Sequence, residues 1–139
     1  MAPPSMFPAD DPRQIREHLL RSCHLARTHG LPSVVVGLAG AEGDLLAPEL
    51  IDYLESALRV EDAIFRMTRE RAVLFLADVN RAQAEGIVAR LVHEFSERFP
   101  AASLPEVSLG YFQVDPGSSE LLVRDVLPAV FPPRSVPPH

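Results

Sequence analysis

Three charged side chains, Arg59, Asp62 and Arg66, stand at regular steps just before a short charged turn at residues 68–70. Arginine carries a planar fork of N–H donors that matches phosphate or carboxylate oxygens, and aspartate accepts N–H donors. The spacing supports two interpretations. The residues form an anion-binding site, or they are structural, with Arg59 as a cation at a helix C-terminus and Asp62 at a turn or strand start.

Other chemically interesting residues lack a supporting arrangement. His18, His24 and His29 lie on one expected helix, but not at the i, i+4 spacing of paired metal ligands, so we expect surface histidines and no metal site. The only cysteine, Cys23, falls on the apolar side of that helix, where packing is a better interpretation than reactivity. We find no Ser–His–Asp set, glycine-rich phosphate loop or useful carboxylate pair, and therefore expect no enzyme of another class.

The bulk composition excludes several classes of protein. The chain has 139 residues, of which 47% are hydrophobic, enough for one globular core. Its net charge of -6 argues against a general nucleic-acid binder, which needs a basic field. The single cysteine cannot form an internal disulfide, and no apolar run reaches the length of a membrane span. We therefore expect a cytoplasmic protein that binds neither nucleic acid nor membrane.

Hydrophobic periodicity predicts alternating helices and strands between two proline-rich ends. We expect flexible tails at residues 1–10 and 128–139 and one domain at 11–127. The expected helices lie near residues 12–29, 46–58 and 80–98, the expected strands are SVVVGLAG, DAIFRM, RAVLFLA and EVSLGYFQV, and a short helix passes through Leu121, Leu122 and Val126. This order predicts an α+β fold, a ferredoxin-like split βαβ arrangement whose antiparallel sheet carries its helices on one face.

The central segment RVEDAIFRMTRERAVLFLADVNRAQAEGIVARL resembles the middle third of GGDEF domains, the diguanylate cyclase family. Arg59, Asp62 and Arg66 hold the places of the family's Arg-x-x-Asp and the arginine that follows it. Gly43 and Asp44 stand at the family's Gly-Asp spacing, and VSLGYF resembles a later strand. The resemblance covers most of residues 16–127 and implies a GGDEF-like, nucleotide-cyclase-like fold.

The chain departs from the family pattern where catalysis would take place. Residues 68–72, Thr-Arg-Glu-Arg-Ala, stand in place of the Gly-Gly-Asp-Glu-Phe signature. The resemblance puts Arg71 at an acidic metal-ligand position, and Gly37 and Ala39 at the aspartates of the first strand. Divalent metals need hard oxygen ligands there. The resemblance therefore implies a degenerate GGDEF domain that is not an enzyme and holds no metal or cofactor.

The family also has a second site, which binds its product cyclic di-GMP. Here Arg59 and Asp62 match its Arg-x-x-Asp part, and Arg90 falls at the position of its helical arginine. Arginine forks suit the phosphates, and a carboxylate accepts the N–H donors of guanine. The resemblance thus implies a cyclic di-GMP receptor. The alternative is a ligand-free module of a bacterial signalling system that binds a protein partner or forms a homodimer.

The charged residues around the turn form a further group. Arg66, Arg69 and Arg71 carry positive charge there, and Asp62 and Glu70 carry negative charge. We expect a solvated cluster around the hairpin, with docking of a partner as the other interpretation.

Overall fold

The sheet has four antiparallel strands in the order β2-β3-β1-β4. A computed structural model describes residues 10–99, 106–116 and 123–131. The elements are α1 (Pro12–His29), β1 (Ser33–Gly40), α2 (Leu46–Ala57), β2 (Ala63–Arg66), β3 (Arg71–Ala77), α3 (Arg81–Arg98), β4 (Val107–Val114) and α4 (Val123–Val130). The predicted α+β fold, its strands and its three longer helices are confirmed. In the described part of the chain, no helix combines the length and apolar character needed to cross a membrane.

Local sequence signals account for the ends of the two long helices. Asp11 accepts a hydrogen bond from the Arg13 backbone N–H at 2.9 Å, and Gly30 ends α1 in a left-handed conformation with φ 64°. Asn80 begins α3 with a reciprocal capping box, in which its side chain bonds Gln83 N–H and the Gln83 side chain bonds Asn80 N–H. These caps satisfy backbone groups that helix ends otherwise leave unpaired.

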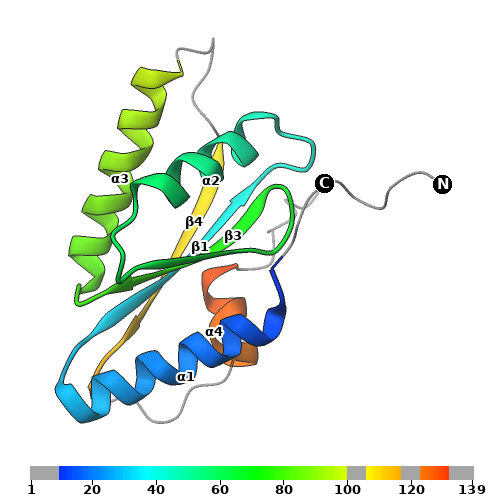
Figure 1. Cartoon of the computed structure of the whole chain (residues 1–139). Helices are drawn as coiled ribbons and strands as arrows, with labels where there is room; N and C mark the ends of the chain where they lie inside the picture. Colours follow the sequence, from blue (N-terminus) through cyan, green and yellow to red (C-terminus); the bar gives the residue numbers. More distant parts are fainter. Residues whose placement is uncertain (1–9, 100–105, 117–122, 132–139) are drawn as a thin grey trace, which may run out of the picture.

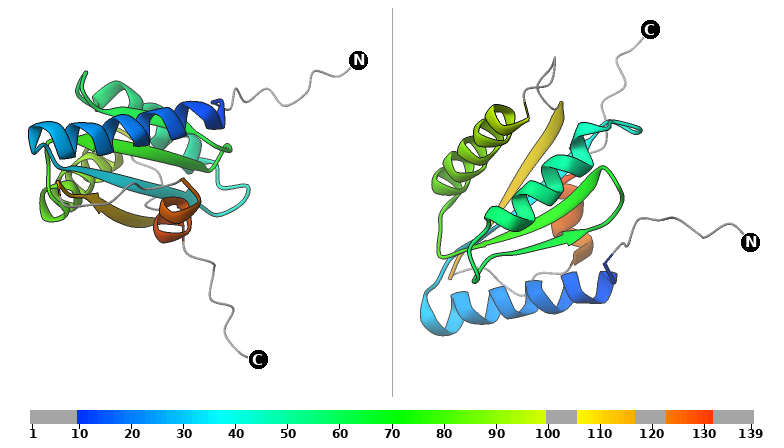
Figure 2. Two further views of the ribbon diagram at one scale, coloured as in Figure 1. Left: turned by 90° about the horizontal axis from the view of Figure 1, so that it is seen from below. Right: turned by 45° about the horizontal axis from the view of Figure 1, so that its top comes forward.

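The helices cover both faces of the sheet, so the expectation that they lie on one face is wrong. The helices α2 and α3 pack on one face, against Val34, Val36 and Leu38 of β1. On the other face, α1 and α4 pack against Val35 of β1 and Phe75 of β3. Figure 1 shows these two pairs on opposite sides of the strands, and the turned views of Figure 2 keep the same layers. Successive side chains of a strand point to opposite faces of the sheet. In β1 and β3 the side chains on both faces are apolar, so both faces require burial.

Residues just outside the predicted domain 11–127 also contact the sheet or continue a helix in the described structure. The Asp10 backbone N–H donates to the Arg66 carbonyl at 2.9 Å, and the Asp10 carboxylate accepts from the Arg66 N–H at 2.6 Å. These bonds pair Asp10 with the outer strand β2. The helix α4 continues to Val130, with Pro128 on its exposed side, because Val126 and Val130 are buried four residues apart on one helix face. Leu121 and Leu122 of the expected short helix lie outside the described residues.

The end of α4 rests directly on two glycines of the sheet. A Cβ atom at Gly37 would lie 2.5 Å from the Val130 carbonyl oxygen, and one at Gly110 would also meet the Val130 backbone. Gly37 and Gly110 are paired neighbours on β1 and β4. The absence of a side chain at both positions therefore lets the helix approach the sheet closely.

We expect Gly37→Ala to lower the free energy of unfolding by about 1–3 kcal/mol, because the added methyl group has to displace backbone of α4. Chemical denaturation of the purified chain measures the change. Gly86→Ala in α3 is the matched control, because nothing lies within 4 Å of its Cβ position. We expect this control to be stabilised by about 0.5–1 kcal/mol. An unchanged Gly37→Ala variant would contradict the close packing of α4.

Candidate functional site

Arg59 and Asp62 form one compact unit in the turn between α2 and β2. The Asp62 backbone N–H donates to the Arg59 carbonyl at 3.0 Å, which closes the turn. Across it, Arg59 Nε donates to Asp62 Oδ2 and Arg59 Nη2 donates to Asp62 Oδ1, both at 3.0 Å. This is the two-pronged geometry in which arginine and carboxylate interact most strongly.

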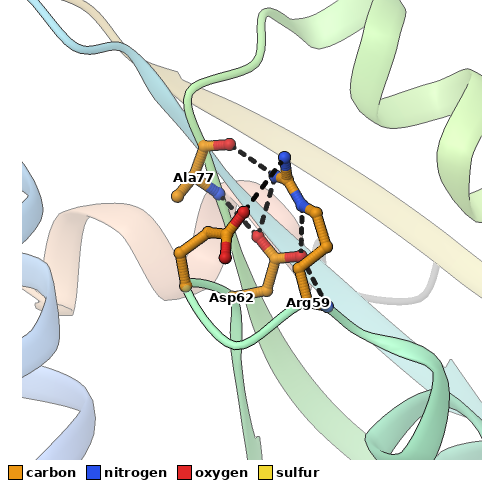
Figure 3. Close-up of polar contacts among 4 residues, drawn as sticks. Arg59, Asp62 and Ala77 are labelled. Atoms are coloured by element: carbon orange, nitrogen blue, oxygen red, sulfur yellow. Dashed lines mark hydrogen bonds and ion pairs between the residues drawn. The ribbon is translucent and has the colours of Figure 1, made fainter.

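The pair also completes the hydrogen bonding of β3. Ala77 is the last residue of β3 and lies beyond the pairing with β2, which ends at Ala63 and Phe75. Its N–H donates to Asp62 Oδ1 at 3.0 Å, and its carbonyl accepts from Arg59 Nη2 at 2.7 Å (Figure 3). The side chains of Arg59 and Asp62 thus form the hydrogen bonds to the Ala77 backbone that a longer β2 strand would have formed.

The two members of the pair differ in their access to solvent. The Asp62 side chain is only 3% exposed and accepts hydrogen bonds from Arg59 and Ala77, so its oxygens face inward. The Arg59 side chain is 47% exposed, and its Nη1 lies 3.4 Å from Glu61. The hydrogen bonds to Asp62 raise the pKa of Arg59, which keeps the guanidinium charged. Arg59 therefore presents a fixed positive charge at the surface.

Arg59 and Asp62 line a cavity of about 530 Å³. The cavity is formed between the second half of α1, the start of β1, the end of β3 and the Arg59 turn. Its lining includes His18, Arg21, Leu25, Pro32, Ser33 and Phe75. This volume falls within the range of small-molecule sites in proteins. We call it the α1 cavity.

Arg90, the third candidate from the sequence, belongs to a different part of the molecule. It is exposed on α3, which packs on the opposite face of the sheet from α1. It does not line the α1 cavity. In the described part of the chain, no hydrogen bond or ion pair joins it to Arg59 or Asp62.

The residues around the hairpin do not form the expected single cluster. Arg66 reaches across to α2, where its Nη2 lies 2.8 Å from Asp52 and 3.0 Å from Glu55. Asp62 lies at the far end of β2 from the hairpin and pairs with Arg59 instead. The prediction of one solvated cluster is therefore wrong, because the strand separates these charges and sends them to different partners.

The positions that the GGDEF resemblance assigns to metal ligands do lie together. Ala39 and Arg71 are direct neighbours across β1 and β3, and Gly37 follows on the same strand. The Arg71 guanidinium lies 5.5 Å from the ring centre of Phe131, just beyond α4. Arginine at such a place repels divalent cations. Among residues 10–99, 106–116 and 123–131, no group of three or more His, Cys, Asp or Glu residues could hold a metal ion.

Two further predictions concern α1. Cys23 is buried in the core, as expected. His18 is not an ordinary surface residue: it is half-buried, with its ring centre 4.5 Å from that of Phe75. Burial and the nearby Arg21 lower the pKa of His18, so its imidazole is neutral at pH 7.

Sequence reasoning missed the lining of the α1 cavity. Ser33 follows a proline and is the first residue of the apolar strand SVVVGLAG. A single polar residue at the start of a buried strand was the only sequence signal that could have indicated Ser33 as a lining residue. Nothing in the spacing of His18 and Arg21 relates them to Ser33, because they come from a different element. Packing of α1 on the sheet brings them together.

Comparison with known proteins finds relatives only through structure. No family model matches the chain, and no curated protein matches it. PelD from Pseudomonas aeruginosa, solved in complex with c-di-GMP, is 25% identical with a TM-score of 0.65, over 87% of this chain and 44% of PelD. The chain therefore spans less than half of the PelD structure.

Two other solved structures from Pseudomonas aeruginosa share the fold. The FimX GGDEF domain is 13% identical with a TM-score of 0.66, and 90% of each chain is covered. The diguanylate cyclase SiaD, solved with its activator SiaC, is 18% identical with a TM-score of 0.58, over 80% of this chain and 49% of SiaD. The fold expected from the resemblance is confirmed by these matches.

We expect Asp62→Ala to lower the free energy of unfolding by about 1–3 kcal/mol, because it leaves the Ala77 N–H and the Arg59 guanidinium without their acceptor. Urea denaturation followed by circular dichroism measures the change. Glu61→Ala removes the neighbouring, half-exposed carboxylate and serves as the control, with an expected change within about 0.5 kcal/mol. Equal effects of the two substitutions would show that Asp62 does not stabilise this turn.

Proposed function

We propose that the chain, a GGDEF-like domain, is a non-catalytic receptor for cyclic di-GMP. The observation that carries the proposal is Arg59, which lines the α1 cavity with its guanidinium held by Asp62 and its side chain 47% exposed. Cyclic di-GMP carries two phosphates, and a fixed guanidinium suits phosphate oxygens. The likeness to PelD in complex with c-di-GMP supports the choice of ligand.

Asp62 acts in this proposal as a positioning residue. Its carboxylate oxygens accept the N–H groups of Arg59 and Ala77, so it orients the guanidinium rather than contacting guanine. Fixing a long side chain before the ligand arrives lowers the entropy cost of binding. Arg90, on α3, remains the second cation that the sequence resemblance suggests for this ligand.

The non-catalytic part of the proposal rests on the positions where metal ligands are required. Gly37 and Ala39 have no carboxylate, and Arg71 is a cation that stacks on Phe131. Phosphoryl transfer depends on metal ions that neutralise the phosphates and on exact positioning of the substrate. The packing of α4 on Gly37 further occupies the space that a side chain at that position would need.

A second candidate function is a ligand-free protein–protein interaction module. It is favoured by the bonds of the Arg59–Asp62 pair, which stabilise the chain's own turn and strand without any ligand. The structure of SiaD with its activator SiaC gives a precedent for protein binding in a protein of similar fold.

We expect Arg59→Ala to weaken cyclic di-GMP binding by about 1.5–3 kcal/mol, the range for a lost charged hydrogen bond. Isothermal titration calorimetry measures the affinity, and thermal unfolding verifies that each variant folds. Arg59→Lys should also weaken binding, because lysine keeps the charge but loses the planar fork. Arg69→Ala, in the exposed hairpin, is the matched control with unchanged affinity. If the unmodified chain does not bind near-millimolar ligand, the interaction module becomes the better proposal.

We expect no conversion of GTP to cyclic di-GMP with Mg²⁺ or Mn²⁺, because the metal positions lack carboxylates. Chromatographic analysis of the nucleotides after prolonged incubation tests this. Product above a no-protein control, from a preparation free of contaminating cyclase, would overturn the non-catalytic part of the proposal.

A further inference from the structure

The α1 cavity contains a buried hydroxyl group that has no partner. Ser33 is only 7% exposed, and its Oγ makes no hydrogen bond within the described part of the chain. By contrast, Ser22 in the same lining donates to the His18 carbonyl of its own helix at 3.0 Å. Leaving a buried polar group unpaired costs free energy. Because Ser33 Oγ itself is covered, a ligand in the cavity gains this hydrogen bond only when the Ser33 side chain rotates toward it.

A second polar residue, His18, also lines this cavity. The His18 imidazole packs against Phe65 and Phe75, and no hydrogen bond to its ring nitrogens is found among the described residues. The lowered pKa of His18, caused by burial and then by Arg21, keeps the ring neutral. A neutral imidazole offers one donor and one acceptor. Together Ser33 and His18 match the edge of a heteroaromatic ring, which also carries both donors and acceptors.

The remaining lining indicates a flat ring with an attached anion. Leu25, Pro32 and Phe75 provide apolar and aromatic walls. The lining also includes two arginines, Arg21 and Arg59. Arg21 is exposed on α1 and makes no ion pair within residues 10–99, 106–116 and 123–131. Figure 2 (right) shows α1, the helix that carries Arg21, running below the green strands β2 and β3.

We propose that the α1 cavity receives the guanine base of a nucleotide, with the base edge at Ser33 and His18 and a phosphate at Arg21 and Arg59. For cyclic di-GMP this deepens the proposed function and rests on it: one guanine enters the cavity and the rest of the ligand stays outside. Arg21, not Arg90, is then the second cation of the site.

Titration calorimetry with cyclic di-GMP and, separately, with GMP tests the inference. Ser33→Ala should weaken binding of both nucleotides about threefold to tenfold, because one hydrogen bond is lost. It should leave the thermal midpoint unchanged or raise it, because the hydroxyl has no partner in the free protein. A purely structural serine would not show this combination.

Arg21→Ala should weaken binding about tenfold to 100-fold, as expected for a lost contact between arginine and phosphate. Arg27→Ala, also exposed on α1 but outside the cavity lining, is the control with unchanged affinity. Loss of cyclic di-GMP binding in Arg90→Ala, with Ser33→Ala and Arg21→Ala unaffected, would overturn the inference and retain the proposed function.

The two nucleotides separate the remaining outcomes. Binding of GMP that is sensitive to Ser33 and Arg21, without binding of cyclic di-GMP, would support the base cavity and overturn the proposed receptor function. Binding of neither nucleotide by the unmodified chain would overturn both. Binding that Ser33→Ala, Arg21→Ala and Arg90→Ala all leave unchanged would locate the ligand elsewhere and overturn the base cavity.

Discussion

The central strands β1 and β3 have no polar face, and this constraint organises the molecule. Every side chain from Val34 to Val36 and from Ala72 to Leu76 is almost fully buried. Such strands are stable only when both faces of the sheet are covered. The helices α2 and α3 cover one face, and α1 and α4 cover the other. The close approach of α4 in turn requires glycine at positions 37 and 110. The composition of β1 thus determines both the layers of the fold and the loss of a side chain where a metal ligand would stand.

The Arg59–Asp62 pair shows how a structural and a binding interpretation can hold for the same residues. Asp62 is fully used in the turn and in pairing with Ala77, which agrees with the interpretation of Asp62 as a turn residue. Arg59 directly follows the C-cap of α2, and in the described part of the chain its guanidinium bonds Asp62 and Ala77 and not a carbonyl of α2. With these bonds in place, the Arg59 side chain is still 47% exposed. A residue can therefore hold the turn and contact a ligand with different atoms.

Periodicity and capping residues were sufficient to predict the elements. Asp11, Gly30 and Asn80 mark helix ends by local hydrogen bonding, and apolar runs mark the strands. The face on which each helix packs was not predictable in the same way, because it depends on which strand face lacks cover. Arg59 and Asp62 are three residues apart and could be paired from sequence. Ser33 and Arg21 lie on different elements and meet only through tertiary packing, so no local pattern relates them.

The outer strand β4 has a consequence for behaviour at high protein concentration. None of its eight residues, Val107–Val114, carries a charge, and uncharged edge strands tend to pair with other chains. The residues just outside it, Glu106 and Asp115, are both acidic. In an antiparallel pair of two β4 strands in full register, Glu106 of one copy would lie opposite Asp115 of the other, and the like charges would repel. This repulsion disfavours pairing of two β4 strands in that register, and high salt would weaken it.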